Sequence, residues 1–334
     1  MKVIFNFHEP FMLAHGGAQV QIEQTKAALE QIGVETGFLE WWNESQRGDI
    51  LHHFGALPMP LISLARDKGW KVVITILLTQ QCNRPNRELL LRKICIRTLM
   101  LAPRRIRARL PWSVFRMCDR VVVGLEAERQ VLERVYGAGK KAVSVIPLGL
   151  SEGFLRAGPG DRKQNHLICH GRIAPTKNCL ELAQLALEAQ VPVLFVGKPQ
   201  DDKSEYWEQF RRLVDNKFVK HHAHVEGEAG MINLLQQSRG FVLMSRFENW
   251  SLSAHEAAAC GLPLLLSDQR WAHERFGDQA SYFSGKGKPA ALAALRRFYE
   301  QCPALPPTKV RLHSWKEVAV TLRDTYAQLL GSSA

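Results

Sequence analysis

Residues 166–189 read HLICHGRIAPTKNCLELAQLALEA and give the clearest indication of the fold class. Residues 166–169 have the apolar character of a buried strand, and residues 178–189 repeat apolar side chains with the period of a helix. A glycine-containing loop joins the two. A strand, a loop and a helix in this order form the unit of a parallel α/β sheet. We therefore expect such a sheet here.

The same alternation continues on both sides. Upstream, we expect strands at 2–7, 49–52, 71–76 and 120–123, with a helix near 19–32. Downstream, we expect strands at 193–196, 223–225, 240–244 and 263–266, and a closing helix at 314–330. A length of 334 residues suits two domains of ~150 residues. The run 143–149 ends the first, and residues 151–165, rich in glycine and charge, read as a linker. The predicted domains are 1–150 and 151–313, followed by a last helix at 314–334.

Composition excludes several classes of protein. No run approaches the ~20 apolar residues of a membrane span, and the N-terminus lacks the pattern of a signal peptide. The seven cysteines form no Cys-x-x-Cys pair and sit mostly in apolar runs, which favours buried reduced thiols. We expect a cytoplasmic globular protein.

Positive charge is concentrated in one segment. The net charge is +12, and between Arg84 and Arg120 eleven Lys or Arg residues stand against two acids. A patch this local implies an anionic partner, such as a phospholipid surface, a nucleic acid or a phosphorylated substrate. Trp112 and Phe115 are its only aromatic residues, which disfavours nucleic acid. A solvated helix face is the alternative.

Two loops contain residue types suited to a nucleotide. Gly16 and Gly17 stand before a helix, where glycine admits a close approach and the helix N-terminus favours an anion; a plain tight turn is the alternative. Arg172 and Lys177 follow a strand and precede a helix, where doubly wound folds bind ligands. Together they suit a diphosphate, although two solvated loop cations would give the same pattern.

A third motif begins at Glu248 and ends at Glu256. A carboxylate can accept hydrogen bonds from both hydroxyls of a ribose diol, so Glu256 is a candidate ribose ligand, with Glu248 toward a donor sugar. The intervening residues Trp250, Ser251 and Leu252 would present backbone N–H groups to phosphate. Ser253 and Glu256 also have the spacing of a capping box, so Glu256 capping its own helix is the alternative.

The order and spacing of these motifs resemble the retaining glycosyltransferases of family 4, also called group 1 glycosyl transferases. HGRIAPTKN is similar to the family's Gly-Arg-x4-Lys segment, and FENWSLSAHEAAACGLP to its Glu-x7-Glu signature. The resemblance implies the GT-B fold, in which two Rossmann-like domains face across a cleft and the last helix crosses back to the N-terminal domain. That domain would bind the acceptor, and residues 151–313 the nucleotide sugar.

The resemblance also assigns roles. Arg172 and Lys177 would hold the donor diphosphate and act in catalysis with Glu248, Glu256 would hold the ribose, and Gly16 and Gly17 would line the donor. It implies no metal and no cofactor beyond the nucleotide-diphosphate sugar. The implied function is that of a retaining hexosyltransferase with a glycan or lipid-linked acceptor, acting in cell-envelope polysaccharide biosynthesis, with the basic segment at the inner face of the plasma membrane and no nucleic-acid partner.

Three positions depart from the family pattern. Leu77 stands where many relatives have a histidine, His170 replaces an apolar residue before Gly171, and Asn249-Trp250-Ser251 replaces an x-Phe-Gly element. His52 or His53 could supply the imidazole, although surface histidines at a strand end are the alternative. A GT-B sugar-nucleotide epimerase and an inactive nucleotide-sugar-binding scaffold stay open as other functions.

Overall fold

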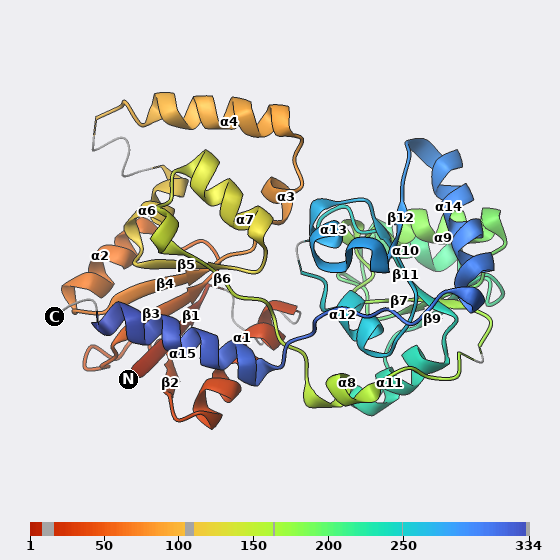
Figure 1. Cartoon of the computed structure of the whole chain (residues 1–334), viewed down its shortest axis with the longest axis horizontal. Helices are drawn as coiled ribbons and strands as arrows, with labels where there is room; N and C mark the ends of the chain where they lie inside the picture. Colours follow the sequence, from red (N-terminus) through yellow and green to blue (C-terminus); the bar gives the residue numbers. More distant parts are fainter. Residues whose placement is uncertain (9–16, 104–109, 163, 249, 332–334) are drawn as a thin grey trace. The chain divides into compact units, whose positions relative to one another are not determined.

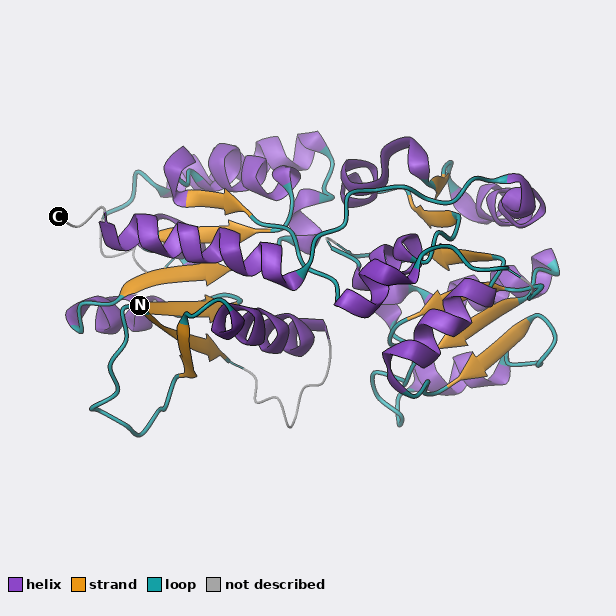
Figure 2. Cartoon of the chain, turned by 60° about the horizontal axis from the view of Figure 1, so that its bottom comes forward, coloured by secondary structure: helices purple, strands orange, loops and turns teal. Residues whose placement is uncertain are grey.

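The computed structural model describes residues 1–8, 17–103, 110–162, 164–248 and 250–331. The chain forms two compact units (Figure 1). Unit 1 comprises Met1–Gly149 and His313–Ala334, and unit 2 comprises Leu150–Leu312. Each unit contains a six-stranded sheet in which every strand pair is parallel, covered by helices (Figure 2). The α/β class with two parallel sheets is confirmed.

Unit 1 has the strand order β2-β1-β3-β4-β5-β6. Its strands are β1 (Lys2–Phe7), β2 (Glu35–Phe38), β3 (Ile50–Phe54), β4 (Lys71–Thr75), β5 (Arg120–Val123) and β6 (Val143–Val145). Its α-helices are α1 (Gly17–Gln31), α2 (Met59–Asp67), α3 (Thr79–Cys82), α4 (Asn86–Leu99), α6 (Val114–Met117), α7 (Glu126–Val131) and α15 (Trp315–Gly331). A π-helical turn, η2 (Leu132–Tyr136), and the 3-10 turns η1 (Pro111–Ser113) and η3 (Lys140–Ala142) complete the unit.

Alternating side chains of this sheet pack on its two faces. Ile4, Leu51 and Ile74 point to the core shared with α2, α6 and α7. On the other face α15 packs beside α1, and Tyr326 places its hydroxyl 2.5 Å from Nδ1 of His52. The last helix is thereby tied to β3 of the same unit.

Both strand-end histidines are buried, so the prediction of surface histidines was wrong. His52 is fully buried, and its Nε2 lies 2.7 Å from the hydroxyl of Thr75. Burial lowers the pKa of His52 to about 3 and that of His53 to about 4, with a further contribution to His53 from His8. Leu77, in contrast, is exposed after β4.

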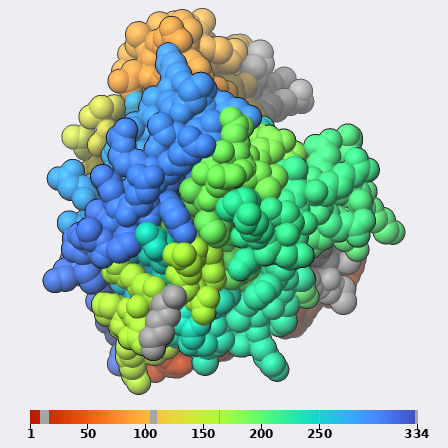
Figure 3. All heavy atoms as spheres, turned by 90° about the vertical axis from the view of Figure 1, so that its right-hand side faces the viewer, coloured from red at the N-terminus to blue at the C-terminus, as the bar shows by residue number. Residues whose placement is uncertain are grey.

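Unit 2 has the strand order β12-β11-β10-β7-β8-β9. Its strands are β7 (Leu167–His170), β8 (Val193–Val196), β9 (Val219–His222), β10 (Gly240–Leu243), β11 (Leu264–Ser267) and β12 (Ser281–Phe283). Its α-helices are α8 (Glu152–Ala157), α9 (Cys179–Ala189), α10 (Glu205–Arg212), α11 (Gly227–Gln237), α12 (Leu252–Ala259), α13 (Arg270–Phe276) and α14 (Gly287–Gln301). The 3-10 turns are η4 (Pro175–Lys177), η5 (Gly277–Gln279) and η6 (Cys302–Ala304). Figure 3 shows the face on which α14, in blue, lies beside the green α9 region.

Two predicted elements need correction, and two strands were not predicted. The strand expected at 223–225 lies earlier, at β9, where the Asp215 carboxylate accepts backbone N–H groups from Lys217, Phe218 and Val219 and so fixes its start. The linker 151–165 contains helix α8, which buries Phe154 and packs on α11 and α12. Sequence also missed β2 and β12, because both are edge strands without fully buried residues.

Candidate nucleotide site in unit 2

The site lies where the strand order of unit 2 reverses. From β7 the chain proceeds to β8 and β9 on one side, and then returns to β10, β11 and β12 on the other side of β7. In open α/β sheets ligands bind outside the carboxyl ends of the two strands at such a switch point. The Gly-Arg-x4-Lys motif lies in the loop after β7, and the Glu-x7-Glu motif begins in the loop after β10 and ends within helix α12. The topology therefore brings the two motifs to one edge of the sheet.

The loop after β7 is shaped by two glycines. Gly171 has φ +135° and Gly197, after β8, has φ +145°. A Cβ atom on Gly197 would lie 2.1 Å from the carbonyl oxygen of Gly171, so no larger residue fits there. A hydrogen bond of 2.9 Å from Gly171 N to Val196 O closes the contact. This packing holds the backbone that carries Arg172.

Arg172 is exposed, and its guanidinium makes no hydrogen bond or ion pair within the described ranges. Its five N–H donors are thus available to an anionic ligand. Lys177 differs, because its ammonium forms a salt bridge with Glu248. Glu248 is 8% exposed, and its carboxylate also lies 3.3 Å from the Ser245 hydroxyl. Lys177 and Glu248, 71 residues apart in sequence, are therefore in direct contact.

Arg246 joins the two loops more broadly. Its backbone N–H donates to Thr176 O at 2.9 Å, and its Nε donates to Asn178 Oδ1 at 2.9 Å. Its guanidinium also pairs with Glu181 on α9. Asn178 has φ +58°, a left-handed conformation that asparagine tolerates better than most residues. These bonds hold Lys177 next to Glu248.

Helix α12 begins at Leu252, and Ser251 is its N-cap, with its hydroxyl accepting from Ala254 N at 3.3 Å. The capping alternative for Glu256 was therefore wrong, because this residue lies within the helix. Trp250 is 5% exposed and stacks on His255, with ring centroids 4.5 Å apart, and the Arg275 guanidinium lies 4.1 Å from the centre of its ring. The Trp250 side chain thus packs at the start of the helix. Its backbone N–H group is the part of the residue suited to the phosphate contact expected from the sequence. Asn249 lies outside the described residues.

Glu256 faces the end of β7. Its Oε2 lies 2.8 Å from His170 Nε2, although the two atoms are not aligned for a hydrogen bond. Burial and the same carboxylate together raise the pKa of Cys260, one turn later, to about 12. One edge of the sheet therefore holds a free guanidinium, a lysine–carboxylate pair and a second carboxylate.

The predicted glycine loop is described only in part. Gly16 lies outside the described residues. Gly17 is the first residue of α1 and is exposed, and a Cβ atom added to it would meet no heavy atom of the described residues within 4 Å. Sequence reasoning had also not assigned roles to His170, Ser245 and Arg246. His170 was visible only as an unusual residue at a strand end, and nothing in the local sequence marks the other two as partners of the motifs.

No group of three or more His, Cys, Asp or Glu suited to a metal ion occurs within the described ranges. Two cations at the switch point can oppose the charge of a diphosphate, and carboxylates can accept hydrogen bonds from sugar hydroxyls.

The two six-stranded parallel sheets match the fold of GT-B glycosyltransferase structures. Residues 154–309, nearly all of unit 2, match the family described as Glycosyl transferases group 1. Within this segment the chain matches that family, which confirms the resemblance to group 1 glycosyl transferases over these residues.

A curated relative and two solved structures are similar to the chain. The GtfA subunit of the UDP-N-acetylglucosamine–peptide N-acetylglucosaminyltransferase of Streptococcus gordonii is 26% identical over 168 residues, 48% of this chain and 32% of the relative. The chain thus spans about a third of that relative's length. Sucrose-phosphate synthase from Thermosynechococcus elongatus has a TM-score of 0.68 at 16% identity, covering 99% of both chains. HepE from Anabaena, solved with UDP-glucose, has a TM-score of 0.62 at 14% identity, covering 99% of this chain and 100% of its own.

Proposed function

We propose that the chain is a retaining, metal-independent hexosyltransferase that transfers a sugar from a nucleotide-diphosphate donor to a glycan or lipid-linked acceptor. The observation that carries the proposal is the meeting of Arg172, Lys177, Glu248 and Glu256 at the switch point of unit 2. The UDP-linked sugars in the names of the GtfA relative and the HepE complex support a donor of this class.

Each residue has a role that its surroundings support. The Arg172 guanidinium and the Lys177 ammonium neutralise the diphosphate as negative charge develops on it when the sugar–phosphate bond breaks. Glu248 orients Lys177 and faces the transferred sugar. The Ser245 hydroxyl holds the Glu248 carboxylate in place. The Glu256 carboxylate accepts hydrogen bonds from the ribose hydroxyls, and the His170 ring lies beside its Oε2 atom. Because the two cations supply the positive charge, the reaction needs no divalent ion.

The second part of the proposal places the basic segment on an anionic membrane surface. Helix α4 lies on the outside of unit 1, next to η2 (Figure 1). One stripe of this helix points outward and is apolar, with Leu90 57% exposed, Leu91 67% exposed and Ile94 54% exposed. Arg87 and Arg97 flank the stripe and are exposed as well. Exposed apolar side chains between cations are typical of helices that lie in a membrane interface.

The other arginines of the segment differ in how far their charge is available to a membrane surface. Arg84 pairs with Glu88, and Arg120 donates to the carbonyl of Lys141. Arg104, Arg105, Arg107 and Arg109 lie outside the described residues. No helix in the described ranges is long and apolar enough to cross a bilayer. We therefore propose peripheral attachment at the inner face of the plasma membrane, in cell-envelope polysaccharide assembly.

The test is a donor panel in EDTA. The protein is incubated with UDP-, GDP-, ADP- and TDP-linked sugars and a bacterial lipid extract, and released nucleoside diphosphate is measured. Transfer with retention predicts release that depends on the extract and a product whose anomeric NMR coupling matches that of the donor. An altered nucleotide sugar without any acceptor product would instead identify an epimerase, and no change in any donor would identify an inactive scaffold.

A further inference from the structure

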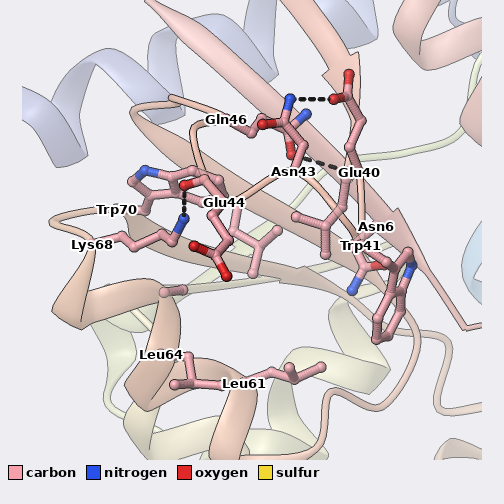
Figure 4. A pocket seen from close by; sticks show the side chains of 13 residues that line it. Asn6, Glu40, Trp41, Asn43, Glu44, Gln46, Leu61, Leu64, Lys68 and Trp70 are labelled. Carbon is pink, nitrogen blue, oxygen red and sulfur yellow. Dashed lines mark hydrogen bonds between the residues drawn. The ribbon is translucent and has the colours of Figure 1, made fainter.

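A pocket of about 280 Å³ opens in unit 1. Its walls are residues 39–46 after β2, helix α2 and the sheet residues Asn6 and Leu51 (Figure 4). Leu61, Leu64 and Ala65 form the apolar side. Glutamate, asparagine, glutamine and lysine side chains surround the opening. The volume lies just below the range of about 300–1,000 Å³ common for small-molecule sites, so it suits a ligand of one or two rings.

Asn6 points to a polar ligand. Its side chain is 4% exposed, lines the pocket and has no hydrogen-bond partner among the described residues. Figure 4 shows it beside the indole of Trp41. Because this amide faces the pocket, water or a ligand in the pocket can supply its hydrogen-bond partner. A hydroxyl group can both donate to and accept from a carboxamide, which makes a polyol a suitable partner.

Trp41 provides an aromatic face at the same pocket. Its side chain is 64% exposed, although large apolar side chains are usually buried. An exposed tryptophan at the rim of a pocket, next to hydrogen-bonding groups, offers a flat apolar surface to a ligand with one apolar face and several polar edges. A pyranose ring has this character.

The rim is held in place by its own hydrogen bonds. Asn43 Nδ2 donates to Glu40 Oε2 at 2.6 Å, and Glu40 N donates to Gln46 Oε1 at 3.0 Å. Lys68 Nζ donates to the carbonyl of Glu44 at 2.9 Å, which ties the end of α2 to the loop. A rim ordered before binding loses little conformational entropy when a ligand arrives.

The charge of the rim selects against anions. Glu40 and Glu44 bring two carboxylates, and the one lysine of the lining is bound to a backbone carbonyl. A phosphate or uronic acid would meet net negative charge, whereas a neutral sugar would meet acceptors for its hydroxyls.

From these observations we infer that this pocket is a pyranose-binding subsite for one neutral sugar ring of the acceptor glycan. Trp41 stacks on the ring, and Asn6 bonds a hydroxyl at its inner edge. The assignment to the acceptor rests on the proposed function, whereas binding of a neutral glycoside by Trp41 and Asn6 does not depend on it.

The test uses methyl glycosides of glucose, galactose, mannose and N-acetylglucosamine with the full chain. Saturation-transfer NMR identifies any that bind, and titration gives the affinity. Trp41→Ala and Asn6→Ala should each lower that affinity at least about tenfold. Trp42→Ala is the matched control, because Trp42 is 97% exposed and does not line the pocket, and it should change affinity less than twofold.

Nucleoside-diphosphate binding, followed by thermal shift on the same variants, separates the two proposals. We expect it to be unchanged in Trp41→Ala, which also shows that the variant is folded. If no glycoside binds, or if binding persists in both Trp41→Ala and Asn6→Ala, the pocket is not a sugar site. If glycosides bind as expected but no nucleotide does, the subsite stands and the proposed transferase function fails.

Discussion

His170 Nε2 lies 2.8 Å from Glu256 Oε2, so the end of β7 contacts the middle of α12. A histidine at this strand end departs from the apolar residue common in the family, and it limits where the Glu256 carboxylate can turn. The Glu256 carboxylate makes no hydrogen bond and no other ion pair within the described part of the chain. Its remaining lone pairs are therefore available to the two hydroxyls of a ribose.

Replacing Glu256 by glutamine should weaken nucleoside-diphosphate binding about 10- to 100-fold. The change removes a charged acceptor, and hydrogen bonds to charged groups are worth about 1.5–3 kcal/mol. Calorimetric titration with the nucleotide that binds the wild type measures the effect. Glu300→Gln is the control, because Glu300 is exposed on α14, and equal affinities of the two variants would argue against a ribose-binding role for Glu256.

Substitutions of Arg172 and Lys177 should differ in their effects on nucleotide affinity and on the free energy of unfolding. Arg172→Ala should weaken nucleotide binding about tenfold or more, yet change the free energy of unfolding by less than about 0.5 kcal/mol, because the side chain is exposed and unpartnered among the described residues. Lys177→Met should lower both the nucleotide affinity and the free energy of unfolding. It leaves the buried Glu248 carboxylate without its cation, which should cost about 1–3 kcal/mol of stability.

Urea unfolding measures the stability difference, and the double variant Lys177→Met/Glu248→Gln tests its cause. Neutralising the carboxylate should recover part of the stability lost in the single variant, although not nucleotide binding. Equal stability of the Lys177 variant and the wild type would show that the salt bridge contributes nothing to the fold.

Helix α4 should bind anionic vesicles through both its charge and its apolar stripe. Arg87→Gln/Arg97→Gln should reduce binding to phosphatidylglycerol vesicles about 30-fold, because each cation near an anionic leaflet contributes about 1 kcal/mol. Leu90→Ser/Leu91→Ser/Ile94→Ser should also reduce it. Sedimentation of the protein with vesicles measures both effects.

Lys140→Gln/Lys141→Gln is the matched control, since it removes two exposed charges outside α4. The same loss in this control and in the arginine variant would indicate a general electrostatic effect and contradict the assignment to α4.

The contact of His52 with Tyr326 should contribute to the stability of unit 1. Tyr326→Phe leaves His52 Nδ1 buried without its partner and should lower the free energy of unfolding by about 1–3 kcal/mol. Denaturant unfolding with fluorescence or circular dichroism tests this, and an unchanged midpoint would contradict it.

The same histidine should make the free energy of unfolding decrease as the pH falls. The folded-state pKa of His52 is about 3 and that of an unfolded histidine about 6.5, so the unfolded state takes up protons first. The contribution of His52 is complete above about pH 6.5 and is lost as the pH falls toward about 3. His52→Gln should reduce the slope of stability between about pH 6.5 and 5, whereas His224→Gln, an exposed control, should retain it.

The central strands of both sheets could be predicted from the sequence, because each is a short apolar run between turn residues. The edge strands β2 and β12 could not be predicted. An edge strand has a neighbouring strand on one side only, and neither β2 nor β12 contains a fully buried residue. Helix α8 was hidden in a polar segment, because Phe154 is its one buried residue.

The residues of the candidate site could be proposed from the sequence, but their contacts could not. Arg172, Lys177, Glu248 and Glu256 stand out by residue type and spacing. Their partners depend on the pairing of β7 with β10, which joins segments about 70 residues apart. The pocket beside Trp41 was missed for the same reason, because its lining comes from β1, β3, α2 and a loop with no motif in common.

The central claim is that unit 2 binds a nucleoside diphosphate at the switch point without a metal. A thermal-shift screen of the wild type against UDP, GDP, ADP and TDP in EDTA tests it most directly. We expect one of these nucleotides to raise the melting temperature, and Arg172→Ala and Glu256→Gln to reduce the shift. No shift with any of the four, or a shift that appears only when a divalent metal is added, would contradict it.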